Sequence, residues 1–201
     1  MTMASVETRK RSTLEELGIV TINTSSNPDK IDILRIPCKP AILIETSNIV
    51  KKLLETFKRL QEETDIKPVG LAAPQIGINA KVAYVNVFRP IFIVNPSYVS
   101  RSGETLQEEE CISLPGERVL TSRNKLVVLE SQGKRMKFGF PLEADSYNTP
   151  VMVRTVKGQY KFYVSQELVE LECAAVQHEI DHLNGVLITE REYKQIVEKV
   201  V

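Results

Sequence analysis

The sequence lacks three features that would point to whole classes of protein: net charge, long apolar runs and paired cysteines. Among 201 residues, 26 basic side chains balance 26 acidic ones. Zero net charge gives no electrostatic reason to expect DNA, RNA or an anionic membrane as a partner. No apolar run approaches the length of a membrane span, and the first residues contain no signal-peptide stretch. The three cysteines cannot all pair, so we expect free or metal-bound thiols in a reducing compartment.

Two main helices are predicted. The first covers residues 47–64, where Ser47 is the N-cap and apolar side chains recur every three or four positions. The second follows the N-cap Ser165 and ends at Gly185, which suits a left-handed cap. A last short helix is predicted over residues 189–200.

The remaining segments predict antiparallel strands and hairpins. In chain order we expect an extended arm over residues 31–37, a small-residue loop over 70–77, strands at 81–87 and 90–94, and hairpins with turns at Gln132-Gly133 and Lys157-Gly158. The fold class is therefore α+β, with antiparallel β-sheets packed around the second helix and one N-terminal amphipathic helix. We expect a single domain over residues 1–201, in which residues 1–30 form an extended or mobile segment.

The only two histidines lie four positions apart, in the segment from Gln177 to Gly185. On a helix, His178 and His182 share one face, so both imidazoles can reach one metal ion. Glu179 then stands beside the ion, where it can act as a base on water. The alternative is a pair of ordinary surface histidines, but both share a stripe with apolar residues and are expected to point inward.

A catalytic metal site on this helix needs a third protein ligand. Ile188 occupies the position at which one protease class carries a third histidine, so we expect the ligand upstream. Cys173 lies about 140° around the helix from His178, away from the metal face. Cys38 lies in an apolar arm, before a lysine, and is expected to be a small buried thiol. Cys111 is the best remaining candidate, in a tight extended segment suited to presenting its side chain.

With these residues the chain resembles the peptide deformylase family. Three motifs carry the resemblance, over roughly residues 30–190: Gly70 to Gly77, Glu109 to Ser113 and Gln177 to Gly185. It implies a hydrolase that removes the formyl group from formyl-methionyl peptides and releases formate. Its partners would be N-formyl peptides and nascent chains near the ribosome, in the cytoplasm or in an organelle stroma or matrix, with no DNA and no membrane.

The resemblance also assigns roles to individual residues. The implied metal ligands are Cys111, His178 and His182, holding one Fe²⁺ per chain, with Zn²⁺, Ni²⁺ or Co²⁺ as substitutes. The implied base is Glu179, and the oxyanion donors are the Gln75 side chain and the backbone N–H of Ile112. The implied substrate contacts are Val69, Gly70, Arg118, Leu171, Ala174 and Ala175, with Leu171 at the back of a roomy pocket for the first side chain. Glu109 and Arg123 would pair and brace the metal loop.

The sequence departs from the family in three places. Glu110 replaces the glycine before the metal cysteine, which would strain the backbone if that position needs positive φ. Pro68 replaces the glycine that usually begins the first motif. Extra length is expected within residues 138–165, as an enlarged hairpin. Glu110 leaves open a non-catalytic deformylase-like binding protein, and the histidine motif leaves open another metallo-amidase or protease.

Overall fold

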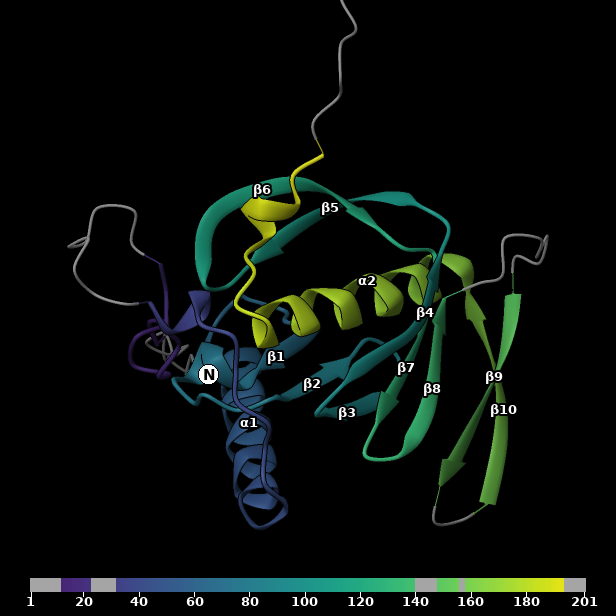
Figure 1. Cartoon of the computed structure of the whole chain (residues 1–201), viewed down its shortest axis with the longest axis horizontal. Helices are drawn as coiled ribbons and strands as arrows, with labels where there is room; N and C mark the ends of the chain where they lie inside the picture. Colours follow the sequence, from purple (N-terminus) through teal and green to yellow (C-terminus); the bar gives the residue numbers. More distant parts are fainter. Residues whose placement is uncertain (1–11, 23–31, 140–147, 156–157, 194–201) are drawn as a thin grey trace, which may run out of the picture.

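The computed structural model describes residues 12–22, 32–139, 148–155 and 158–193 (Figure 1). Its helices are η1 (Ile33–Arg35), α1 (Leu43–Glu63), η2 (Ala73–Ile76), α2 (Gln166–Leu183) and η3 (Ile188–Arg191). Its strands are β1 (Gly70–Ala72), β2 (Val82–Asn86), β3 (Pro90–Val94), β4 (Ser97–Ser102), β5 (Thr105–Cys111), β6 (Leu114–Arg123), β7 (Leu126–Ser131), β8 (Lys134–Gly139), β9 (Asn148–Thr155) and β10 (Gly158–Ser165). All strand pairs are antiparallel, which confirms the α+β class.

The sheet β1-β2-β3 lies between the two long helices, with α2 on one face and α1 on the other (Figure 1). Along β2, Ala83 and Val85 pack in the cluster on the α2 side, while Val82 and Tyr84 pack in the cluster on the α1 side. Covering both faces explains why this strand is a continuous run of buried apolar residues rather than an alternating one. The strands predicted at 81–87 and 90–94 are confirmed.

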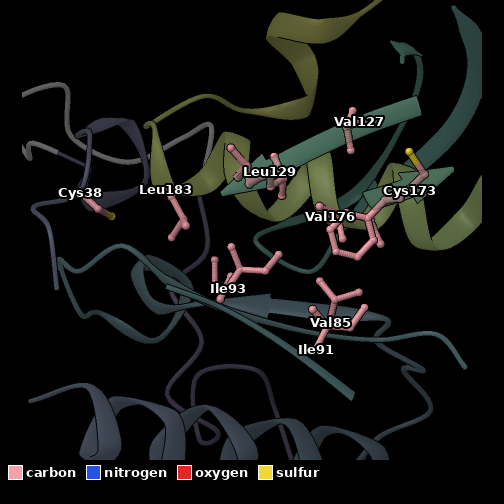
Figure 2. Packing of buried hydrophobic residues seen from close by; sticks show 14 residues of the cluster. Cys38, Val85, Ile91, Ile93, Val127, Leu129, Cys173, Val176 and Leu183 are labelled. Atoms are coloured by element: carbon pink, nitrogen blue, oxygen red, sulfur yellow. The ribbon is translucent and has the colours of Figure 1, made fainter. Parts of the chain in front are cut away.

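The other strands surround α2. The sheet β4-β7-β8 packs against it from the side, and the hairpin β5–β6 arches over it (Figure 1). Figure 2 shows Val176 of α2 between Val127 and Leu129 on one side and Val85 and Ile93 on the other. Burying these side chains is the main favourable contribution to folding. It also fixes α2 in the middle of the molecule.

Local signals set the turns and the ends of α2 as expected. Ser165 caps the helix by accepting a hydrogen bond from Leu168 N, and Gly185 follows with a φ of 71°. Gln132 and Gly133, both with positive φ, form the two-residue turn between β7 and β8. The hairpin β9–β10 is also confirmed, although Lys157 of its turn lies outside the described residues.

Several expected boundaries were wrong. Helix α1 begins at Leu43, not at Ser47, and Thr46 already belongs to its buried face. The arm at 31–37 contains the 3₁₀ turn η1, capped by the Asp32 side chain. The loop at 70–77 is a short strand followed by the 3₁₀ turn η2.

The ends of the chain are only partly described. Residues 1–11 and 23–31 lie outside the described residues, but residues 12–22 are fastened to the core through buried Leu17 and Ile19. Of the helix expected over 189–200, the structure shows only η3, and residues 194–201 lie outside the described part. Among the described helices, none is long and apolar enough to cross a membrane.

Candidate active site

Helix α2 brings the two histidines together in the interior. The His178 and His182 rings lie with their centroids 4.9 Å apart, as the i, i+4 spacing requires. His182 is fully buried, and only 12% of the His178 side chain is exposed. Both imidazoles therefore face inward, which excludes an ordinary surface pair.

Cys111 reaches the same point from the opposite side. It is the last residue of β5, and Ile112 and Ser113 form the two-residue turn that leads into β6. The expected extended segment after the cysteine is therefore a hairpin tip. Cys111 Sγ lies 3.2 Å from His182 Nε2, and the donor atoms of Cys111, His178 and His182 all lie within 4.8 Å of one another. One thiolate and two imidazoles are the donors that Zn²⁺ and Fe²⁺ accept, so this set fits a single transition-metal ion.

The other two cysteines take no part in this cluster. Cys38 and Cys173 are buried in the apolar core around Val176, and the Cys173 thiol donates to Asn124 O. Burial raises the pKa of Cys173 to about 12, so it stays a thiol.

Glu109 fixes the orientation of His178. His178 Nδ1 lies 2.9 Å from Glu109 Oε2, which leaves Nε2 for a metal. Arg123 donates to both oxygens of Glu109, at 2.6 and 2.7 Å. Burial alone would raise the pKa of Glu109, but the hydrogen bonds from Arg123 and His178 outweigh it and lower the pKa to about 2. The carboxylate is therefore charged at neutral pH.

Glu179 is a buried acid on the wall of a cavity. Its side chain is buried, and its Oε2 has no hydrogen-bond partner among the described residues. Burial raises the pKa of Glu179 to about 7, against a smaller opposing effect from His178. An acid that gains and loses its proton near neutral pH beside a metal site suits proton transfer.

Gly70 of β1 closes over this acid. A Cβ built at Gly70 would overlap Glu179 Oε1 and lie 2.8 Å from its Cδ. The backbone of β1 can approach the carboxylate only because residue 70 has no side chain.

We expect Gly70→Ala to lower kcat/KM by about 10²-fold, because the added methyl group displaces the Glu179 carboxylate beside the candidate metal site. Steady-state kinetics together with the metal content would measure this. The metal content should not change, because Gly70 contributes no ligand. A variant that keeps both its metal and its wild-type kcat/KM would contradict this reading of the contact.

Gln75 points its amide group at the cysteine. Its Oε1 accepts a hydrogen bond from Ala72 N at 2.8 Å, which orients the side chain. Its Nε2 then lies 3.3 Å from Ser113 Oγ and 3.7 Å from Cys111 Sγ. The N–H donors of Gln75 are thus held beside the ligand cluster.

A cavity of about 600 Å³ opens onto these groups. Its walls include most of the substrate contacts implied by the sequence: Val69, Gly70, Leu171, Ala174 and Ala175, together with Ile112. The two alanines are buried, but Leu171 is 38% exposed, so it lies at the mouth and not at the back as expected. Arg118 is not among the lining residues.

Glu110 and Arg118 face each other across β5 and β6. Arg118 Nε donates to Glu110 Oε1 at 2.7 Å, and both side chains are about two-thirds exposed. Among the described residues, only Asn95 and Gln132 combine a side chain with positive φ. Glu110 therefore carries no left-handed strain, and its side chain points to solvent at the rim of the cavity.

The sequence over residues 19–197 matches the family described as polypeptide deformylase. The chain belongs to the polypeptide deformylase family. Peptide deformylase 1 of Bacillus cereus is 34% identical over 164 residues, which cover 80% of this chain and 86% of that protein. The peptide deformylase of Dictyoglomus turgidum is 30% identical over 162 residues, covering 79% and 86%.

Solved deformylase structures share the fold. The Thermotoga maritima enzyme matches with a TM-score of 0.60 and 24% identity, over 88% of this chain and 97% of that one. The actinonin-bound class I type b deformylase of Acinetobacter baumannii matches with a TM-score of 0.56 and 26% identity, also over 88% and 97%. The chain is accordingly a hydrolase of the deformylase type.

Sequence reasoning missed several residues that support the site. Thr121 donates to Glu109 Oε1 at 2.8 Å, and Ser113 lies fully buried beside Gln75. Asp181 accepts a hydrogen bond from Arg123 at 2.5 Å. Asp181 could have been suspected, since an acid on an inward-facing turn between two histidines needs a buried cation.

Proposed function

We propose that this deformylase removes the N-formyl group from formyl-methionyl peptides, using Cys111, His178 and His182 as metal ligands and Glu179 as the base. One observation carries the assignment: the three donors and an unpartnered buried carboxylate meet at the cavity of a deformylase fold. The proposed resident ion is Fe²⁺, the ion that the family resemblance implies. Zn²⁺, Ni²⁺ and Co²⁺ are proposed substitutes, because a single thiolate with two imidazoles accepts all four ions.

The proposed chemistry divides between the cluster and its neighbours. A divalent ion held there would lower the pKa of a water molecule. Glu179 accepts the proton of the attacking water and later delivers it to the departing amine. The Gln75 side chain and the Ile112 N–H donate to the formyl oxygen as negative charge builds on it, each worth about 3 kcal/mol. The products are formate and a peptide with a free N-terminus.

The substrate is proposed to bind along β1. This strand is an edge of its sheet and lines the cavity, so its free backbone groups at Gly70 can pair with an extended peptide. The first side chain would then enter the apolar space beside Ala174 and Ala175. Because such a peptide is the start of a nascent chain, we propose that the protein acts near the ribosome, in the cytoplasm or in an organelle stroma or matrix.

Formate release tests the function. The 201-residue chain, loaded anaerobically with Fe²⁺, is expected to release formate from formyl-Met-Ala, to lose this activity with a chelator and to leave casein intact. Casein cleavage without formate release would show a protease instead. Retained metal with no formate release from either wild type or Glu110→Gly would show a binding protein.

The structure weakens the case for a binding protein. Glu110 was the only feature that favoured it, and the side chain is neither strained nor directed at the ligands. We therefore expect Glu110→Gly and wild type to release formate at similar rates.

The pocket for the first side chain is proposed to be roomy, because its buried walls are the alanines 174 and 175. We expect wild type to cleave formyl-Met, formyl-norleucine and formyl-Phe peptides with kcat/KM values within about tenfold of one another. Ala175→Leu should lower kcat/KM for formyl-Phe most, by about 10²-fold, because its added carbons fill the wall. A strict wild-type preference for small first residues would refute the roomy pocket.

A further inference from the structure

Asp181 lies between the two histidines on α2, is buried, and has no part in the proposed chemistry. Its carboxylate is shared by two guanidinium groups. Arg123 Nη1 donates to Oδ2 at 2.5 Å, and Arg191 donates to Oδ2 at 3.1 Å and to Oδ1 at 2.8 Å. Arg123 and Asp181 are both buried, whereas the Arg191 side chain is 44% exposed and reaches the carboxylate from the surface. Asp181 therefore links a buried cation to a cation at the surface.

These groups form one continuous hydrogen-bonded network that ends at His178, a proposed metal ligand. Arg123 is two-sided: one edge holds Asp181, and the other holds the carboxylate of Glu109. Glu109 in turn holds His178 Nδ1. Negative and positive groups alternate from Glu109 through Arg123 and Asp181 to Arg191, so a change at the far end alters the charge balance around the imidazole.

Arg191 comes from the segment after the catalytic helix. It is the last residue of η3, which folds back against β5 and β6 (Figure 1). The fold-back is fixed by Tyr193 N, which donates to Leu120 O at 2.7 Å, and by the bridge between Thr121 and Glu192. Thr121 also donates to Glu109. The C-terminal segment therefore touches the network that orients His178 at two places.

We infer that Arg191 is a positioning residue for the metal site, acting through Asp181, Arg123 and Glu109 on His178. The inference rests on the proposed ligand set. It differs from a simple docking role, in which Arg191 would only hold η3 against the sheet. The chain offers a matched control, because Arg35 also holds η3, through an exposed ion pair with Glu190 at 2.7 Å that does not touch Asp181.

Cobalt binding to the 201-residue chain tests the inference. Metal-free wild type, Arg191→Ala, Arg191→Lys and Arg35→Ala are titrated with Co²⁺ against a competing chelator, and the visible absorption of each complex is recorded. We expect Arg191→Ala to bind Co²⁺ about tenfold more weakly, with shifted absorption bands. Its kcat should fall while KM for formyl-Met-Ala stays the same. Arg191→Lys should recover part of the affinity, and Arg35→Ala should match wild type.

Two results would overturn the inference. One is an Arg191→Ala protein with wild-type Co²⁺ affinity and absorption. The other is an equal loss in Arg35→Ala, which would reduce Arg191 to a docking role. If Arg191→Ala does not fold, Arg191→Lys is compared with Arg35→Ala and wild type instead. Its Co²⁺ affinity is then expected to be below that of wild type. A wild-type protein that lacks the thiolate-to-Co²⁺ absorption band would instead refute the ligand set itself.

Discussion

Replacing Glu179 with glutamine is expected to lower kcat for formyl-Met-Ala by about 10³-fold, while the metal content stays at one ion per chain. Glutamine keeps the size of the side chain but cannot accept the proton. Burial raises the pKa of Glu179 to about 7, so wild-type kcat/KM should fall at acid pH as Glu179 becomes protonated. A bound cation favours the carboxylate, so in the metal-loaded protein this fall should begin at or below pH 7. Glu179→Gln should not show this acid fall.

Glu179→Gln is expected to lower activity but to raise the stability of the fold above neutral pH. A carboxyl group with a raised pKa stabilises the fold below its ordinary pKa and loses this contribution as the pH rises through about 7. Metal-free Glu179→Gln should therefore resist urea better than wild type at pH 8, the usual exchange of stability for activity. Glu167→Gln, an exposed acid on the same helix, is the matched control and should change neither quantity. A Glu179→Gln protein with wild-type kcat would refute the proposed mechanism.

Local signals explain why the catalytic helix could be predicted from the sequence. Ser165 and Gly185 mark its ends through contacts within a few residues, and the spacing of His178 and His182 fixes their shared face. The turn at Gln132-Gly133 is equally local. In each case the deciding interaction lies within four residues, so no knowledge of the rest of the fold is needed.

The resemblance implied the pairing of Glu109 with Arg123, which the structure contains, but strand β5 itself was not predicted. Strand β5 turns Gln107 and Glu109 inward and leaves Leu106 43% exposed, the reverse of the usual pattern. Its inward acid is satisfied by Arg123 and Thr121 from the next strand and by His178 from α2. The start of α1 was missed for a related reason.

That start lies in the run Ile42 to Ile44, whose side chains are exposed, so apolar periodicity gave no sign of a helix there. Likewise, the pairing of Asp181 with Arg191 depends on how η3 folds back against β6. A pattern along the chain cannot reveal such contacts, because the partners are chosen by packing.

Arg123→Met is expected to lower the free energy of unfolding of the metal-free protein by about 4 kcal/mol at pH 7. Arg123 is only 4% exposed and lies between the carboxylates of Glu109 and Asp181. Methionine keeps the length of the side chain but leaves two buried negative charges without their shared cation. Urea unfolding of the metal-free chain measures the loss separately from metal binding.

The pH dependence of this loss follows from Glu109, whose pKa is lowered to about 2. A lowered pKa stabilises the fold above the ordinary value and loses this contribution as the pH falls toward 2, so the loss in Arg123→Met should be constant from pH 7 to 5 and shrink below that. Adding Glu109→Gln and Asp181→Asn should restore part of the stability, because no buried charge is then left unpaired. Arg59→Met, which breaks only an exposed pair with Glu63, should leave unfolding unchanged. If Arg123→Met and Arg59→Met have the same free energy of unfolding, the network of Glu109, Arg123 and Asp181 does not hold the segment around Cys111 in place.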